Sequence, residues 1–199
     1  MTTPRTYHHG DLRNTLIAEG VALLEEGGVT NMSLRAIAAR AGVSHAAPKN
    51  HFANLRALYT AMAAEGYRRH VAFMRAGLPK RASRTAKLAA AMKGYVRFAQ
   101  EHPHLFALMF SSDLCDLEDA ELQTAGAESY GVLREISAGL DWDKADKPHA
   151  DLRAETMIWS LVHGFALLTN SGMLKTGPDG TAMPALSVTD VVPAFKYRS

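Results

Sequence analysis

Apolar residues recur along this chain at intervals of three and four, which is the spacing of one buried face of an α-helix. No segment shows a convincing alternation of apolar and polar residues, the pattern of a half-buried strand. We therefore predict an all-α protein. The expected helices lie at about residues 10–26, 34–41, 45–51, 55–77, 87–101, 104–111, 121–138, 149–174 and 188–195.

Residues 31–52 have the pattern of two short helices joined by a tight turn. Ser33 is a good N-cap for the first of them. The apolar positions that follow share one helix face: Leu34, Ile37, Ala38 and Ala41. Gly42 comes next, where a helix end often needs a positive φ, and Ser44 is placed to cap the second helix. This layout matches a DNA-binding helix-turn-helix, although the spacing fits an ordinary helical hairpin equally well.

The expected helix at residues 149–174 is apolar on two sides. One face holds Met157, Ile158, Leu161, Val162, Phe165 and Leu168. The other face holds Trp159, His163, Ala166 and Asn170. A helix of this kind must be covered on more than one side. One face can therefore close the core of this chain while the other meets a second subunit.

Composition narrows the class of protein. The chain has 199 residues, of which 47% are hydrophobic, enough for a globular core. Its one cysteine, Cys115, excludes an internal disulfide and fits a reducing cytoplasm. The first residues lack the apolar core of a signal peptide, and no apolar run approaches the roughly 18 residues that span a bilayer. We expect a cytoplasmic protein without a membrane partner.

Charge is unevenly distributed along the chain, although the net charge is only +2. Residues 1–93 hold 14 Lys and Arg against 5 Asp and Glu, whereas residues 94–199 hold 8 against 15. A basic front half suggests contact with a polyanion such as DNA. Residues 1–56 alone balance at only +2, so much of the excess lies beyond the hairpin and can also be solvated helix surface.

The sequence offers no catalytic set. It contains no Gly-rich nucleotide loop and no G-x-S-x-G motif. Two histidine pairs, residues 8–9 and 102/104, lack a carboxylate or cysteine at metal-site spacing. Cys115 lies in an acidic loop, where carboxylates should raise its thiol pKa and disfavour a redox role. We expect no enzyme activity, no metal and no cofactor.

The chain resembles the tetracycline-repressor (TetR) family of transcriptional regulators. The front matches through Gly27-Gly28, the run T-x-x-S-L-R-A-I-A-A-R-A-G-V-S at residues 30–44, His51-Phe52 and Leu58. The back half resembles the family's Trp-His-Gly (WHG) type of ligand domain. The residues that carry this second match are His102-Pro103, Met109-Phe110, Trp159 and His163-Gly164.

The resemblance implies about nine helices, with a DNA-binding head at residues 1–54 and a ligand-binding and dimerisation domain at 55–199. It also implies a homodimer that binds a pseudo-palindromic operator in double-stranded DNA, usually as a repressor released by a small molecule. The residues that the resemblance assigns to DNA are Ser33, Arg35, Ser44, His45, Ala46, Lys49, Asn50, His51 and Arg56. In such surfaces phosphate contacts position the head and base-edge contacts specify the sequence.

Two departures from the family pattern affect the DNA contacts. Lys49 stands where the family often has Tyr, and Leu55 stands where it often has Lys. Arg56, one residue on, either substitutes for that Lys or does not. Pro48 can contact a thymine methyl or be neutral. An alternative is therefore a helical module that binds a small molecule or a protein and keeps a vestigial head.

The ligand site is expected among bulky residues of the back half. The candidates are Met92, Phe98, Phe106, Met109, Phe110, Tyr130, Trp159, His163 and Phe165. Each of these can equally be an ordinary core residue, and a hydrogen-bonded structural role is favoured for His163. Few charges fall among them, so the ligand is expected to be apolar or aromatic.

Overall fold

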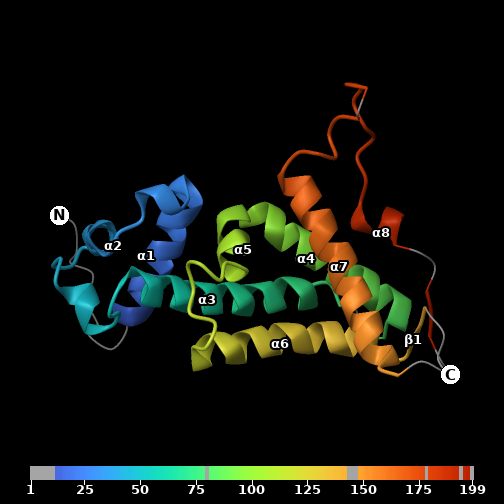
Figure 1. Ribbon diagram of the computed structural model, residues 1–199, viewed down its shortest axis with the longest axis horizontal. Helices are drawn as coiled ribbons and strands as arrows, with labels where there is room; N and C mark the ends of the chain where they lie inside the picture. The colour runs from blue at the N-terminus through green and yellow to red at the C-terminus, as the bar shows by residue number, and fades with distance from the viewer. Residues whose placement is uncertain (1–11, 79–80, 143–147, 178, 193–194, 198–199) are drawn as a thin grey trace.

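The computed structural model describes residues 12–78, 81–142, 148–177, 179–192 and 195–197, and helices form almost all of it (Figure 1). Its α-helices are α1 (Leu12–Gly27), α2 (Leu34–Arg40), α3 (Leu55–Arg75), α4 (Arg84–Glu101), α5 (Pro103–Met109), α6 (Ala120–Ser137), α7 (Ala150–Asn170) and α8 (Val188–Val191). Two 3-10 segments are η1 (Val29–Asn31) and η2 (Ala47–Asn50). The predicted all-α class is confirmed, with η2 in the place of the helix expected at 45–51.

The second helix of the predicted hairpin is therefore shorter and tighter than expected. Its bonds join residues three apart, as from the Ala47 N–H to the Ser44 carbonyl at 3.0 Å. Pro48 has no N–H, so the bond that would join it to the Ser44 carbonyl in the expected α-helix is missing. The expected side-chain cap by Ser44 is wrong, because Ala46 precedes η2 and makes no side-chain cap.

The sequence also did not predict a short antiparallel β-ribbon. It pairs β1 (Leu140–Asp141) with β2 (Lys196–Tyr197), and Leu140 lies opposite Tyr197. Strands of two residues are too short to show an alternating pattern. The ribbon fastens the end of the described chain to the segment that follows α6.

The small head consists of α1, α2, η2 and the start of α3, and capping contacts between residues close in sequence define its turn. The Ser33 hydroxyl caps α2 by accepting from the Ala36 N–H at 3.0 Å, as predicted. Gly42 has φ +69°. The Val43 N–H reaches the Ala38 carbonyl at 3.0 Å, which is the hydrogen bond of a Schellman helix end. These contacts fix the turn between α2 and η2.

The inner side of the head is apolar and close-packed. Its buried residues include Leu16, Ile17, Val21, Leu24, Ile37, Phe52, Leu58 and Met62. A Cβ on Gly20 would lie 2.9 Å from the Met62 sulfur, so α1 and α3 approach closely there. On the outside, Arg40 ties α2 to α1 through ion pairs with Glu19 at 2.8 Å and Glu26 at 2.6 Å.

Helix α3 runs along the length of the molecule and joins the head to the C-terminal body (Figure 1). Asn54 caps its start by accepting from the Ala57 N–H at 2.9 Å. Its first turns complete the head core, whereas later residues such as Met74 are buried in the body. The predicted boundary at residue 54 thus coincides with the cap of a helix that serves both parts.

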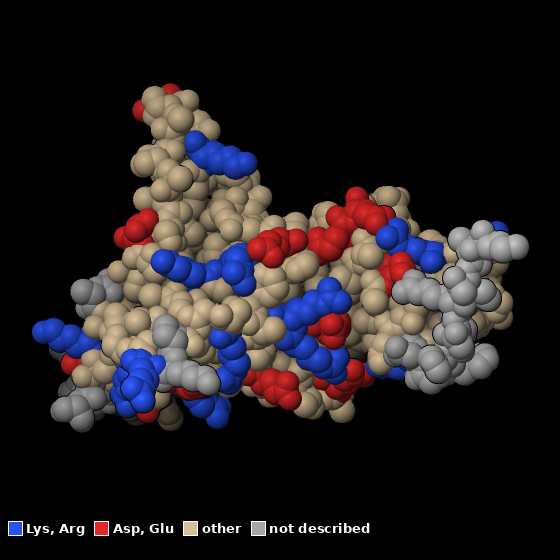
Figure 2. All heavy atoms as spheres, turned by 180° about the vertical axis from the view of Figure 1, so that it is seen from behind, with Lys and Arg blue, Asp and Glu red and all other residues tan. Residues whose placement is uncertain are grey.

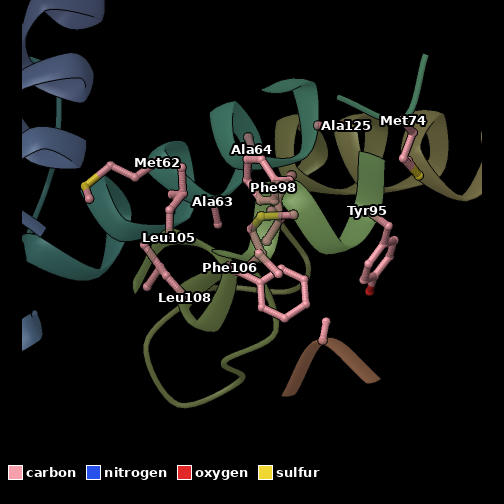
Figure 3. Close-up of a cluster of buried hydrophobic side chains, with 14 of the residues drawn as sticks. Met62, Ala63, Ala64, Met74, Tyr95, Phe98, Leu105, Phe106, Leu108 and Ala125 are labelled. Atoms are coloured by element: carbon pink, nitrogen blue, oxygen red, sulfur yellow. The ribbon is translucent and has the colours of Figure 1, made fainter. Parts of the chain in front are cut away.

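The body packs α4, α5, α6 and α7 around the distal part of α3. At Gly94 a Cβ would lie only 2.2 Å from the Phe73 carbonyl oxygen, so glycine is what lets α4 cross α3 at this distance. The core beside the crossing contains Phe98 and Phe106, which are almost fully buried, and lies against Ala64 of α3 (Figure 3). In the described ranges, no helix is both long enough and apolar enough to cross a membrane.

Candidate DNA-binding surface and ligand cavity

The residues predicted to contact DNA all lie at the surface. They come from the cap and first turn of α2, the turn that follows it, η2, and the first turn of α3. The exposed set is Ser33, Arg35, Ser44, His45, Ala46, Lys49, Asn50, His51 and Arg56. Because Ile37, Ala38 and Phe52 are buried on the opposite side, the head presents these side chains outward from a packed support.

Two residues near this surface have internal contacts. Pro48 is buried, so it faces the head interior and the thymine-methyl interpretation does not fit its position. The Arg56 guanidinium donates to the Cys115 carbonyl at 2.8 Å and so connects α3 to the loop before α6. Leu55, at the position where the family often has Lys, is half-buried.

Some basic residues of the front half of the sequence pair with acidic residues of the back half within the described residues. Arg13 and Arg68 both pair with Glu121, at 2.5 and 2.6 Å, and Arg75 pairs with Glu135 at 3.2 Å. Basic and acidic side chains accordingly alternate over the middle of the face in Figure 2. Three basic residues of the front half are therefore balanced by two acidic residues of the back half.

An apolar cavity of about 260 Å³ lies in the body between α3, α4, α6 and α7. It is lined by Tyr67, His70, Met74, Ala91, Met92, Tyr95, Phe110, Gly126, Ser129, Tyr130, Leu133, Ile136, Ile158, Trp159 and Val162. None of these residues is an Asp, Glu, Lys or Arg. A concave apolar site with a few polar groups is the usual form of a small-molecule pocket.

The cavity separates the predicted ligand residues into two groups. Met92, Phe110, Tyr130 and Trp159 line it. Phe98, Phe106, Met109 and Phe165 are buried outside its lining and form part of the core, and His163 also lies outside the lining. The sequence alone did not separate wall from core, because both are bulky apolar residues on the same helices.

His163 has a structural contact, as the sequence favoured. Its Nδ1 lies 2.8 Å from the Tyr95 hydroxyl. Burial lowers the pKa of His163, so its ring is neutral and its Nδ1 can accept from the tyrosine. His163 thereby fastens α7 to α4 beside the cavity.

His70 and Ser129 are polar residues of the cavity that the sequence did not single out. Nδ1 of His70 lies 3.0 Å from the Ser129 hydroxyl, and His70 is only 2% exposed. Burial lowers the pKa of His70 to about 3, and nearby His163 acts in the same direction. The available signal was the spacing of Tyr67, His70 and Met74, which share one face of α3 with a polar residue between two bulky ones.

Head and cavity are connected through α5. Glu25, near the end of α1, accepts from the Leu105 N–H at 2.8 Å and so caps the N-terminus of α5. At the other end of the same helix, the Tyr67 hydroxyl donates to the Met109 carbonyl at 3.0 Å. Phe110 follows directly and lines the cavity. One short helix therefore contacts both α1 and a helix of the cavity wall.

Cys115 is buried, and burial raises the pKa of its thiol to about 11. The direction agrees with the prediction, but the cause is burial and not neighbouring carboxylates. In the described ranges no three His, Cys, Asp or Glu side chains are grouped to hold a metal ion. The histidine pair at residues 8–9 lies outside these ranges.

Comparisons with known proteins agree with this architecture. Residues 16–62 match the family model for bacterial regulatory proteins of the tetR family, and residues 88–191 match the model for the tetracyclin repressor-like C-terminal domain. Among curated proteins no sequence matches significantly.

Several solved structures are similar. A protein of unknown function from Rhodococcus sp. RHA1 is 35% identical, with a TM-score of 0.71 over 87% of this chain and 90% of that one. LfrR from Mycobacterium smegmatis, solved in complex with proflavine, is 17% identical, with a TM-score of 0.56 over 81% of this chain and 86% of that one. PfmR from Thermus thermophilus is 18% identical, with a TM-score of 0.54 over 88% of this chain and 97% of that one.

The second family model covers more than half of the chain, and the first covers the head whose turn, cap and exposed surface are described above. The chain therefore belongs to the TetR family of DNA-binding transcriptional regulators, which are not enzymes.

Proposed function

We propose that this regulator is a homodimeric repressor that binds a pseudo-palindromic operator and leaves it when an apolar or aromatic inducer enters the body cavity. The observation that carries the proposal is the exposed polar set on a rigid helix-turn-helix, joined through α3 and α5 to an apolar cavity. A repressor of this kind would act in the cytoplasm, where it has access to DNA.

The DNA contacts are proposed from exposure and chemistry. Lys49 and Asn50 are exposed at the end of η2, where a lysine can reach guanine acceptors or phosphate and an asparagine can read adenine. Ser33 and Arg35 lie at the start of α2, where backbone N–H groups also favour a phosphate. Ser44, His45, Ala46 and His51 flank η2. Arg56 is not among the proposed DNA contacts, because its guanidinium donates to the Cys115 carbonyl and so links α3 to the loop between α5 and α6.

The dimer is proposed to form through the outer face of α7. Leu152, Trp159 and Leu167 are exposed on one face of that helix, and Leu168 is exposed on the side opposite to Trp159. A Cβ on Gly164 would meet nothing within 4 Å, so a partner helix has room to cross there. Exposed apolar residues that gather on one helix face are typical of an interaction site. The hydrogen bond between His163 and Tyr95, and the place of Trp159 in the cavity wall, support assignment of the body to the Trp-His-Gly type of ligand domain.

Release is proposed to follow a population shift. Two heads must be spaced about one helical turn of DNA apart to enter successive major grooves. A ligand that contacts Phe110 would favour one placement of α5, and Glu25 would transmit that placement to α1. Only a difference in ligand affinity between the two states can drive release. Small-angle scattering with and without ligand should show a change in head spacing, and unchanged spacing with release intact would refute this route.

Operator binding is tested by a fluorescence anisotropy titration with DNA from upstream of the protein's own gene at several salt concentrations, together with sedimentation to establish the dimer. Binding should weaken steeply with salt, because basic side chains displace counterions. The double variant Lys49→Ala, Asn50→Ala should bind at least about tenfold more weakly. Lys93→Ala, an exposed charge on α4, is the matched control and should bind as wild type. Equal binding by the double variant would favour the vestigial-head alternative.

A further inference from the structure

One atom in the cavity wall has no partner. Nε2 of His70 is buried and makes no hydrogen bond, and of the buried side-chain nitrogens and oxygens in the described residues it is the one so left. Buried polar groups in folded proteins are almost always paired, so an unpaired one calls for an explanation. The other ring nitrogen is already placed against Ser129, so the ring cannot turn to exchange the two without breaking that contact.

The imidazole of His70 is also held in position by its neighbours. The ring of Tyr95 meets it edge to face with centroids 4.4 Å apart, and the ring of Phe98 lies 5.2 Å away. Tyr95 and Ser129 line the cavity together with His70. The unpaired nitrogen therefore belongs to a residue of the cavity wall, and a small movement of that wall would let a ligand supply the missing partner.

The size and charge of the cavity limit what can enter it. A dry apolar cavity of roughly 150 Å³ accepts benzene, so about 260 Å³ suits a body of one or two rings. The lining has no Asp, Glu, Lys or Arg to neutralise an ion. The buried carboxylate nearest to the wall, Glu155, already accepts from the Tyr130 hydroxyl at 2.5 Å. An ion would lose its hydration without gaining a counter-charge.

We propose that the inducer is an uncharged aromatic molecule of one or two rings with a single hydrogen-bonding group, and that this group pairs with Nε2 of His70. This inference rests on the proposed ligand function of the cavity and names its polar anchor. A hydroxyl is the group that suits the site best. It can donate to Nε2 when Nδ1 carries the proton, and accept from Nε2 when Nδ1 accepts from Ser129. The flat ring would occupy the space between Met92, Ile158 and Trp159.

Three probes of one shape test the inference: 2-naphthol, 2-methylnaphthalene and 2-naphthoate. They differ in whether the substituent forms a neutral hydrogen bond, forms none, or carries a charge. Binding is measured by isothermal titration calorimetry on the full-length protein without DNA. Wild type should bind 2-naphthol about tenfold more tightly than 2-methylnaphthalene, since only the hydroxyl satisfies Nε2. It should bind 2-naphthoate more weakly than either.

Variants locate the effect at His70. In His70→Leu the preference for 2-naphthol over 2-methylnaphthalene should disappear while 2-methylnaphthalene still binds. His70→Gln places an amide near the position of Nε2 and should restore part of the preference. Val71→Ile, one residue along α3 and outside the cavity lining, is the matched control and should keep the wild-type ratio. Circular dichroism on each variant confirms that it is folded.

Each result decides between the proposals. Equal affinity of wild type for 2-naphthol and 2-methylnaphthalene, a preference retained in His70→Leu, tighter binding of 2-naphthoate, or no binding of any probe would overturn the inference. Operator binding is measured separately by the anisotropy titration. A His70-dependent preference without release of DNA would support the anchor and contradict inducible repression. If a ligand releases DNA from wild type and from His70→Leu alike, inducible repression is supported and the anchor is contradicted.

Discussion

The head and the body of this protein differ in how their functional surfaces are built. The outer surface of the head is polar, and most of its proposed contacts lie within the 19 residues from Ser33 to His51. The cavity of the body is apolar and concave, and its wall combines residues from Tyr67 to Val162 on four helices and the segment after α5. One surface depends on a cap and a turn, and the other on how distant helices cross. Substitutions that act on only one of these two kinds of contact should therefore affect the head or the body separately.

The largest effect is expected where α4 crosses α3. Gly94→Ala would place a Cβ 2.2 Å from the Phe73 carbonyl oxygen, so the two helices must move apart and the cavity wall with them. We expect the free energy of unfolding to fall by about 3 kcal/mol, the upper part of the range for overpacked cores. Urea denaturation followed by circular dichroism measures it.

Gly131→Ala is the matched control for this crossing. Gly131 also lies inside a helix, but a Cβ there would meet nothing within 4 Å. The free energy of unfolding should rise by up to about 1 kcal/mol, because alanine favours a helix more than glycine does. A similar loss in both variants would show that helix propensity, and not the approach of the two backbones, determines the result.

The next largest effect is a pH dependence of the free energy of unfolding, which a histidine of the body causes. The pKa of His70 is about 3 in the folded protein, whereas an exposed histidine titrates near 6.5, so the unfolded chain binds a proton that the native state does not. Stability should therefore be unaffected above about pH 6.5 and should fall as the pH is lowered toward 3. At pH 5 the loss relative to pH 7 is about 2 kcal/mol, from about 1.4 kcal/mol for each pH unit below 6.5.

Urea denaturation at pH 7, 6 and 5 measures this dependence. His70→Leu should remove most of it. His163→Leu should remove less, because burial also lowers the pKa of His163 but that ring is only half-buried. A pH dependence that is unchanged in His70→Leu would mean that His70 is not the buried neutral group described above.

The smallest effect concerns the contact that joins the two regions. Glu25→Ala removes the carboxylate that caps α5, and loss of a helix cap costs about 1 kcal/mol of stability. It should also reduce the effect of a bound ligand on operator affinity, since α5 would no longer be tied to α1. Thermal unfolding and anisotropy titrations with and without 2-naphthol measure the two consequences.

Glu26→Ala is the neighbouring control. Glu26 pairs with the exposed Arg40 inside the head, so its loss should lower the melting temperature less and leave the effect of ligand on operator affinity unchanged. If both variants reduce that effect equally, the coupling does not pass through α5.

The sequence predicted the fold well where the signals were local. The spacing of apolar residues located every α-helix of the described ranges, and Ser33 and Gly42 marked the start and end of α2 as expected. It failed at η2, where a 3-10 segment that contains the buried Pro48 stands in place of the predicted α-helix. The two-residue ribbon was missed because it pairs segments that are far apart in the chain, Leu140 with Tyr197 among them.

The candidate ligand site was only partly predictable. Four of the predicted residues, Met92, Phe110, Tyr130 and Trp159, line the cavity, and their contact with a ligand stays a prediction. Phe98 and Phe106 are chemically the same but are buried in the core, and a sequence does not state which side of a helix faces an empty space. The sequence did not identify His70, because its role depends on a hydrogen bond with Ser129, which is 59 residues away.

By itself, the sequence determined the helical class and the outward-facing turn of the head, because caps, glycine and apolar spacing act over a few residues. The tertiary structure decided which bulky residues line the cavity and which lie in the core. It also decided which glutamates pair with Arg13, Arg68 and Arg75. It left Nε2 of His70 without a hydrogen-bond partner. Those outcomes depend on how α3, α4, α6 and α7 cross, and such long-range packing brings together residues whose positions along the chain carry no record of it.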